Sequence, residues 1–277
     1  MLKIKINDFN LDDTVTCGQI FRYEKESDGS YTIILKDRVI NVKLIKDELI
    51  ITSNNEENLE SVVKTYFDLD RNYDLINEII LSYDKNLKDV VSYCHGLKMI
   101  KQDPFETVIS YVISQNNSVN AIRNSLNLIS EKYGKSVEFN NKKYYLFPDI
   151  KELVNLTEAD FRNMKVGFRD KYLVSVLKNI DGNILNLDEI NNMETKVALD
   201  IFMSNKGIGP KVASCILLFA YQKFDVFPVD TWVKKYMKDS FDIVGEQNII
   251  KYAKKIYKDY SGIVIQYMFH AKRNKNI

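Results

Sequence analysis

The sequence predicts an α+β protein, with an N-terminal antiparallel β-sheet followed by an all-helical region built around a helix–hairpin–helix. Three observations lead to this fold class. The first fifty or so residues are rich in Ile, Val, Tyr and Phe, which favours strands. After Asn55 the apolar residues recur every three or four positions, which indicates helices. Late in the chain, Gly207 and Gly209 form a Gly-x-Gly turn between two helical stretches.

The N-terminal strands are separated by short polar turns. Asp28-Gly29 and Lys46-Asp47 are residue pairs that suit tight turns between antiparallel neighbours. We therefore expect an antiparallel meander. Its predicted strands are residues 2–6, 18–25, 30–36, 39–45 and 48–52.

The remaining chain is predicted to be helical. Asp103-Pro104 is a good helix start, because Asp caps free amide groups and Pro fits the first helical position. Helices are expected near residues 105–114, 118–133, 158–165, 170–180, 194–204, 210–221, 230–238 and 246–260, with a loop or small ribbon at 134–149. The prediction is thus a β-rich N-terminal domain with flanking helices, residues 1–95, and a helical region, residues 96–277, that can be split into two subdomains.

Composition excludes several classes of protein. The net charge is only +1, so binding to nucleic acid would need a local cationic face. Three cysteines without CxxC spacing are too few for a four-thiolate iron–sulfur cluster, and two histidines make a zinc site improbable, so we expect no metal. The longest apolar runs, 212–221 and 263–269, are too short to span a membrane. No signal-peptide pattern opens the chain, which favours a cytoplasmic location without membrane partners.

The segment KGIGPKVA, residues 206–213, is the most informative part of the sequence. Its two glycines allow the backbone to approach a phosphate, whose charge then meets free amides at a helix N-terminus. Lys211 lies in the first turn of that helix and Cys215 is four residues later, so both share one helix face. Asp230 follows at the end of an extended FPVD step. Taken singly, these features indicate a turn, a solvated lysine and a helix cap.

Together these features resemble the helix–hairpin–helix, Gly/Pro-rich loop and aspartate signature of the helix–hairpin–helix DNA glycosylase superfamily. A lysine at position 211 is similar to the mark of its bifunctional members, which have glycosylase and AP lyase activities. Further segments resemble the 8-oxoguanine DNA glycosylase branch in the same order along the chain, from about residue 15 to about residue 270. They are CGQIFR at 17–22, GLKMIKQDP at 96–104, SQNN at 114–117 and GFR at 167–169.

The resemblance implies roles for the residues of the hairpin region. Lys211 is the nucleophile, which attacks the sugar C1′ as a neutral amine. Asp230 stabilises the cationic sugar and assists proton transfers. The amides around Gly207 and Gly209 hold DNA phosphates. Trp232 departs from the pattern, because the family commonly has a phosphate-contacting histidine at this position.

The resemblance also implies a pocket for the damaged base, which must first be flipped out of the duplex. Phe269 stacks on one face of the base and Cys215 on the other, and a backbone carbonyl at Gly18 accepts from N7. Guanine carries a lone pair at N7 where 8-oxoguanine carries a hydrogen, so this acceptor rewards the lesion. Gln266 is the candidate for the Watson–Crick edge, although an alignment fixed on Phe269 puts Ile265 at that position.

The resemblance implies roles at the opposite DNA strand for a third group of residues. Asn116 and Arg169 match residues that hold the base opposite the lesion, and Phe168 is a wedge for the emptied stack, unless it is a core aromatic. Where stricter relatives have a second arginine, this chain has Ala121. Arg123 lies two residues further, about 200° around a helix, and is expected to point away.

The sequence therefore predicts a base-excision repair enzyme that removes 8-oxoguanine from duplex DNA. We expect no cofactor, no obligate protein partner and a monomer. Two alternatives remain open. One is an alkylated-base glycosylase, against which Lys211 weighs, because those enzymes usually rely on the aspartate alone. The other is a non-catalytic helix–hairpin–helix module that only binds DNA.

Overall fold

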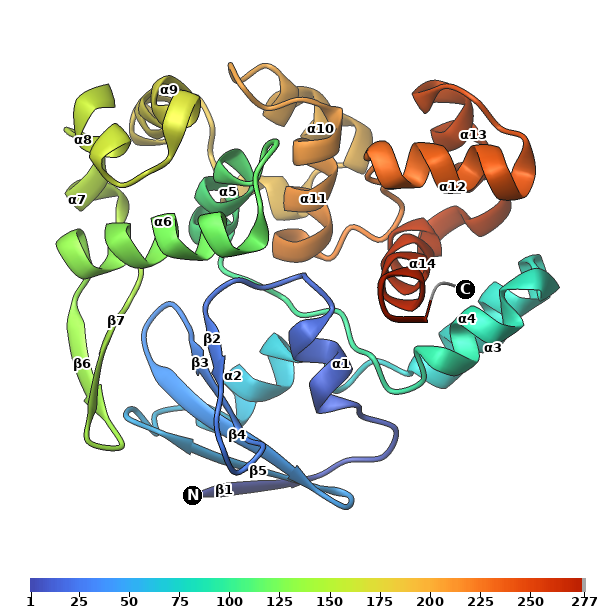
Figure 1. Cartoon of the computed structure of the whole chain (residues 1–277), viewed down its shortest axis with the longest axis horizontal. Coiled ribbons are helices and arrows are strands. Elements are labelled where there is room, and N and C mark those ends of the chain that lie inside the picture. The colour runs from blue at the N-terminus through green and yellow to red at the C-terminus, as the bar shows by residue number, and fades with distance from the viewer. Residues whose placement is uncertain (276–277) are drawn as a thin grey trace.

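The computed structural model describes residues 1–275 and places the β-sheet at one end of the molecule and most helices at the other (Figure 1). Every neighbouring pair in the five-stranded sheet is antiparallel, in the order β1-β5-β4-β3-β2. The predicted α+β class is confirmed. The strands are β1 (Leu2–Lys5), β2 (Tyr23–Lys25), β3 (Tyr31–Ile34), β4 (Val39–Ile45) and β5 (Glu48–Ser53).

The strand order departs from a simple meander at one edge. Strands β2 to β5 follow one another as hairpins, whereas β1 pairs with β5, with Leu2 opposite Ile51. Thus β1 and β2, consecutive strands in the chain, lie at opposite edges of the sheet. The buried face of the sheet shares one hydrophobic core with α1 (Leu11–Thr16) and α2 (Leu59–Tyr66).

The strand predicted for residues 18–25 begins only at Tyr23. The residues before it are held by a side chain instead of a neighbouring strand. Gln19 is fully buried, and its Nε2 donates to the carbonyls of Thr14 at 2.8 Å and Lys98 at 2.9 Å. Its Oε1 accepts from the amide of Ile100 at 2.9 Å. This bridge satisfies the buried backbone groups that a strand ladder would otherwise pair.

The helical region is built around α11 (Pro210–Tyr221), whose residues from position 212 onward are all buried. It packs against α5 and α10. The other helices are α3 (Tyr73–Tyr83), α4 (Lys88–Tyr93), α5 (Pro104–Ile113), α6 (Val119–Tyr133), α7 (Ile150–Leu153), α8 (Glu158–Asn163), α9 (Asp170–Asp181), α10 (Thr195–Met203), α12 (Thr231–Phe241), α13 (Glu246–Tyr257) and α14 (Ser261–Lys275). A small ribbon, β6 (Ser136–Phe139) with β7 (Lys142–Tyr145), extends beside the sheet (Figure 1).

The helical core takes in α3 and α4, which pack near α13 and α14, and it also includes Cys17 and Phe21 from the N-terminal part of the chain. The core of the sheet includes Ile100 in turn. The domain boundary predicted at residues 95/96 stays a prediction. The C-terminal end of the predicted helical region, residues 276–277, lies outside the described residues. Among residues 1–275, we find no helix that combines the length and the apolar character needed to cross a membrane.

Candidate active site

The hairpin between α10 and α11 requires glycine at one position and leaves the helix end open at the other. Gly207 has a φ of +89°, and a Cβ there would lie 2.3 Å from Cγ of Tyr172. Gly209 caps α11, and a Cβ on it would meet nothing within 4 Å. The first amides of α11 have no partner within the helix, so they are free for an anion.

Lys211 and Asp230 lie close to the same thiol. Burial raises the pKa of Cys215, the charge of Lys211 and a hydrogen bond from it lower that pKa, and the charge of Asp230 raises it. Lys211 is half-buried, and its Nζ lies 5.7 Å from the ring centroid of Tyr111. The structure thus brings together a primary amine, a thiol and a carboxylate next to the open helix end.

Asp230 also caps α12. Its Oδ1 accepts from the amide of Val233 at 2.7 Å, so the simpler interpretation as a helix cap is correct as far as this oxygen goes. No hydrogen bond or ion pair within residues 1–275 occupies Oδ2. The cap therefore fixes the direction of the carboxylate and leaves one oxygen for a reacting group.

A second set of predicted residues meets where α14 passes the loop at residues 17–18. Gly18 has a φ of +93°, and a Cβ there would lie 3.5 Å from Cε1 of Phe269 and 3.3 Å from Nη1 of Arg273. The positive φ favours glycine at this position, whereas a Cβ would meet Phe269 at an ordinary contact distance. The buried Gln266 donates through Nε2 to the carbonyl of Cys17 at 3.1 Å. Gly18, Gln266 and Phe269 are therefore neighbours.

Tyr111 of α5 connects these two sets. Burial raises its pKa well above the usual value, and the nearby Cys215 and Cys17 thiols raise it further. Its ring stacks on Phe219 at 5.6 Å and 13° and meets Phe21 edge-on at 5.8 Å. Tyr111 forms the floor between α11 and the loop that carries Gly18.

The predicted opposite-strand residues form one group around the turn after α5. Asn116 is exposed with a φ of +46°, and Phe168 is 52% exposed, as a wedge requires. Arg169 is only 6% exposed, and its guanidinium donates to three backbone carbonyls. They are Gln115 at 2.7 Å from Nε, Val166 at 2.9 Å from Nη1 and Asn116 at 2.9 Å from Nη2. Here Arg169 holds the Asn116 turn.

Arg123 faces away from this turn, toward the sheet. Its Cζ lies 4.0 Å from the ring centroid of Tyr23, and two of its buried guanidinium nitrogens have no hydrogen-bond partner within residues 1–275. Its direction agrees with the helical spacing. It does not occupy the place that an arginine at position 121 would have.

The sequence did not point to three residues of the site, Tyr111, Tyr172 and Arg273, or to the contact that Trp232 makes. Tyr111 and Tyr172 are apolar-face residues of ordinary helices, and nothing in their spacing indicates a function. Tyr172 covers Gly207 and meets Phe168 edge-on at 6.4 Å, so it connects the wedge to the hairpin. Arg273, noted above as a neighbour of Gly18, and Trp232 contact Phe269, which only the fold brings to them.

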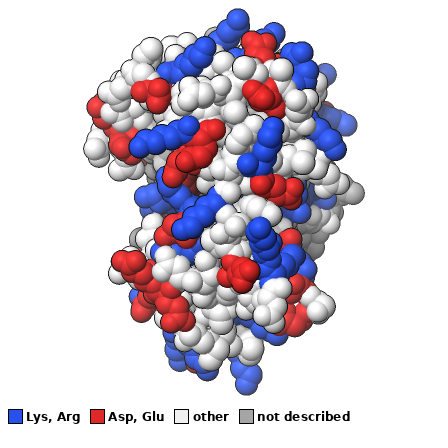
Figure 2. Space-filling view, turned by 90° about the vertical axis from the view of Figure 1, so that its left-hand side faces the viewer, with Lys and Arg blue, Asp and Glu red and all other residues white. Residues whose placement is uncertain are grey.

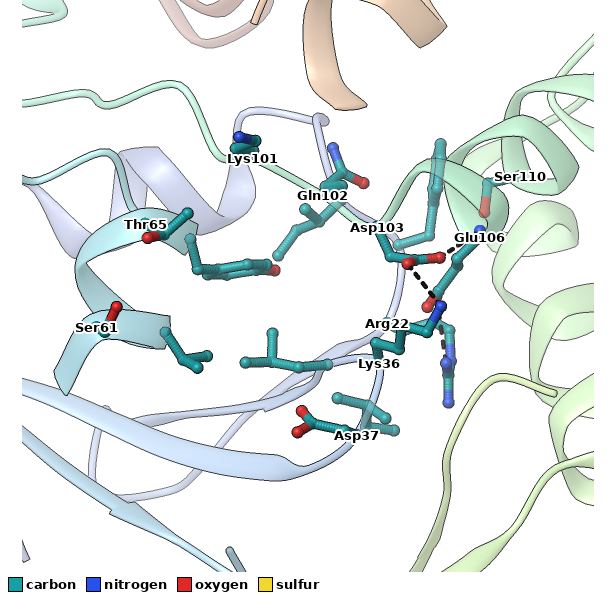
Figure 3. A pocket seen from close by; sticks show the side chains of 16 residues that line it. Arg22, Lys36, Asp37, Ser61, Thr65, Lys101, Gln102, Asp103, Glu106 and Ser110 are labelled. Atoms are coloured by element: carbon teal, nitrogen blue, oxygen red, sulfur yellow. Dashed lines mark hydrogen bonds and ion pairs between the residues drawn. The ribbon is translucent and has the colours of Figure 1, made fainter. Parts of the chain in front are cut away.

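A cavity of about 360 Å³ lies beside residues 20–22, away from the predicted site residues (Figure 3). Two ion pairs line it, Lys36 with Asp103 at 3.2 Å and Arg22 with Glu106 at 3.2 Å. None of the residues predicted for the site lines it, so it is separate from the groups around Lys211 and Gly18.

Charges of both signs are interspersed on the face that carries α7 and α8 (Figure 2). This agrees with a net charge of +1 and shows that this face is not a broad cationic surface. Metal-ligating groups gather at one place within residues 1–275, where exposed Asp8, Asp74 and His95 bring ligand atoms within 4.8 Å of one another. None of these three is a predicted site residue.

Comparisons with known proteins agree with the geometry. A family model described as the N-terminal domain of 8-oxoguanine DNA glycosylase matches residues 1–108. The chain is 36% identical to a Clostridium acetobutylicum 8-oxoguanine glycosylase/lyase, solved with double-stranded DNA containing cytosine opposite 8-oxoguanine. That match covers 100% of this chain and 99% of the other, with a TM-score of 0.93.

Two curated relatives are more distant. The chain is 26% identical to a probable N-glycosylase/DNA lyase of Methanothermobacter thermautotrophicus, over 99% of this chain and 96% of the relative. It is also 26% identical to an N-glycosylase/DNA lyase of Saccharomyces cerevisiae, over 90% of this chain and 73% of the relative. With the hairpin, the amine–thiol–carboxylate group and a full-length relative at 36% identity, the chain belongs to the 8-oxoguanine DNA glycosylase/AP lyase family of the helix–hairpin–helix superfamily.

Proposed function

We propose that this protein is a bifunctional DNA glycosylase and AP lyase that removes 8-oxoguanine from duplex DNA in base-excision repair. The observation that carries the proposal is that Lys211 and Asp230 both act on the Cys215 thiol, one by a hydrogen bond and its charge and the other by its charge, beside an open helix N-terminus. An amine, a carboxylate and an anion site together suit attack on a sugar whose phosphates are held nearby. We also propose that the protein acts in the cytoplasm.

The proposed reaction begins with the lesion flipped out of the stack, at a cost of roughly a few kcal/mol. Phe168, half exposed on the surface, fills the gap. The Nζ of Lys211 then attacks C1′, the C1′–N9 bond breaks, and the base leaves with the bonding electron pair and takes a proton at N9. The free Oδ2 of Asp230 faces the positive charge that develops on the sugar, which lowers the barrier.

The covalent intermediate explains the lyase step. The sugar ring opens and the amine at C1′ becomes a Schiff base, which makes a hydrogen at C2′ acidic. Loss of that proton expels the 3′ phosphate, so the strand breaks by β-elimination with no change in oxidation state. Lys211 is thus proposed to serve both activities.

Selection of the lesion is assigned to the meeting point of the 17–18 loop and α14. The carbonyl of Gly18 accepts from N7–H of 8-oxoguanine, and guanine is disfavoured because two lone pairs would face each other. Gln266 is already bound to the carbonyl of Cys17 through Nε2, so its Oε1 is the group left for the Watson–Crick edge. Phe269 and Cys215 close the two faces of the base.

Borohydride reduction tests the whole proposal. With duplex DNA containing 8-oxoguanine opposite cytosine, a covalent protein–DNA adduct is expected, because the reagent reduces the Schiff base to a stable amine. The matched duplex with guanine should give none. Tight binding of the lesion duplex without an adduct would favour the non-catalytic module, and an adduct-free release of alkylated bases would favour an alkylated-base glycosylase.

We also expect weak discrimination among bases opposite the lesion. Position 121 is alanine and offers no hydrogen-bond donor, and Arg123 lies against the ring of Tyr23. The guanidinium of Arg169 donates to backbone carbonyls. A missing bidentate contact removes roughly 1–3 kcal/mol of discrimination, about tenfold to a hundredfold in rate. Single-turnover excision should therefore be fastest opposite cytosine yet measurable opposite the other three bases.

Ala121→Arg is the matched gain-of-contact variant for this prediction. It should increase the preference for cytosine about tenfold or more, because it supplies the absent guanidinium. If the unchanged protein already prefers cytosine several thousandfold, another residue makes the contact and the prediction is wrong.

A further inference from the structure

Trp232 is the single tryptophan of the chain and touches the proposed stacking wall of the lesion pocket. Its ring meets that of Phe269 nearly perpendicular, at 84° and 5.8 Å between centroids. On α12 itself it lies stacked on Tyr236, at 16° and 5.4 Å. Trp232 is half-buried and lies two residues after Asp230, so it is next to both the chemistry and the pocket.

Behind Trp232 a continuous row of aromatic rings runs into the core. Tyr236 meets Phe241 at 6.0 Å, Phe241 meets Tyr252 at 5.6 Å, and Tyr252 meets Tyr257 at 6.2 Å. Tyr257 is fully buried and donates from its hydroxyl to Oδ2 of Asp84 at 3.1 Å. We call these rings, from Trp232 to Tyr257, the aromatic row. The hydrogen bond to Asp84 anchors the buried end of the row, and Trp232 lies at its other end.

The other neighbours of the Phe269 ring are less able to hold it. Arg273 is exposed, with its Cζ 5.8 Å from the centroid, and its Nη2 donates to the carbonyl of Thr16 at 2.5 Å, so it borders the ring on the side of the 17–18 loop. Gly18 has no side chain, and its Cα only limits how far the ring can move toward the loop. On the α12 side, the aromatic row packs against Phe269 through Trp232.

We propose that Trp232 is a positioning residue that holds Phe269 in the orientation needed to stack on the flipped base. The inference rests on the proposed function and adds a specificity-determining residue to it. If the Phe269 ring already has its stacking orientation, no side-chain entropy is lost at this residue when the flipped base binds. The contact from Trp232 therefore affects binding of the lesion duplex more than binding of DNA in general. An aromatic pair of this kind corresponds to about threefold to tenfold in an equilibrium or rate constant.

The first experiment uses Trp232 as its own reporter. In a Lys211→Gln background, which blocks chemistry, the tryptophan emission of the full chain is recorded during titration with duplex DNA. We expect a change in emission with the 8-oxoguanine duplex and little change with the matched guanine duplex, and Phe269→Leu should abolish the difference. Identical responses to both duplexes would mean that Trp232 senses DNA in general, which overturns the proposal.

The second experiment compares Trp232→Ala with the conservative Trp232→Phe. Single-turnover excision by Trp232→Ala should fall about threefold to tenfold and binding of the lesion duplex should weaken similarly, while binding of the guanine duplex stays constant. Trp232→Phe keeps an aromatic edge for Phe269 and should recover most of both losses. Tyr83→Ala removes an aromatic residue outside the row and serves as the matched control with unchanged excision.

The outcomes separate this inference from the proposed function. If the unsubstituted protein neither excises 8-oxoguanine nor forms the borohydride adduct, the proposed function fails. If it does both and Trp232→Ala is equally fast and selective, only the positioning role fails. Equal weakening for both duplexes in Trp232→Ala would make Trp232 a DNA-backbone contact instead and also contradict the inference.

Discussion

Replacement of Lys211 by glutamine should abolish 8-oxoguanine excision and borohydride trapping while the protein still binds duplex DNA. Glutamine is a polar side chain one atom shorter than lysine, and its uncharged amide is not a nucleophile. Removing a covalent nucleophile costs on the order of 10³-fold or more in rate. Backbone amides of the hairpin remain, so the dissociation constant for DNA should change by about threefold or less.

Lys196→Gln is the matched control, because Lys196 is an exposed lysine of α10, the helix before the hairpin. It should excise the lesion and form the adduct at the rate of the unsubstituted protein. Near-normal excision by Lys211→Gln would show that the amine is not the nucleophile and that the bifunctional assignment to this residue is wrong.

Asp230→Asn should slow excision about 10²- to 10³-fold without loosening the site. Asparagine caps a helix about as well as aspartate. The Val233 amide, which donates to Oδ1 of Asp230 at 2.7 Å, should therefore keep its hydrogen bond in the variant. The variant therefore removes the charge and keeps the cap. Single-turnover rates, together with the thermal midpoint of unfolding, measure the two effects separately.

Asp103→Asn makes the corresponding exchange at the cap of α5, where Oδ1 accepts from the Glu106 amide at 2.9 Å, and it also removes the charge that pairs with Lys36 at 3.2 Å. Asp103 is outside the proposed site, so its excision rate should stay within about twofold of normal. Equal rates for Asp230→Asn and the unsubstituted protein would leave Asp230 as a helix cap alone.

The fold class was predictable because its signals are local. Strand alternation, the change to helical period after Asn55 and the Asp103-Pro104 helix start each depend on residues a few positions apart. The edge position of β1 and the loss of a strand at residues 18–22 were not predictable in this way. The first depends on pairing with β5, and the second on the Gln19 side chain bridging to residues 98–100.

The sequence by itself supplied the candidates for chemistry, because Lys211, Cys215 and Asp230 stand together in a segment that resembles the signature of the superfamily. Only the tertiary structure decided what surrounds them. Trp232 meets Phe269 from another helix, Tyr111 underlies the pocket, and Arg169 turns its guanidinium to carbonyls far away in the chain. The physical reason is that contact energies depend on distance and orientation in space, which sequence spacing specifies within a helix or turn but not between elements.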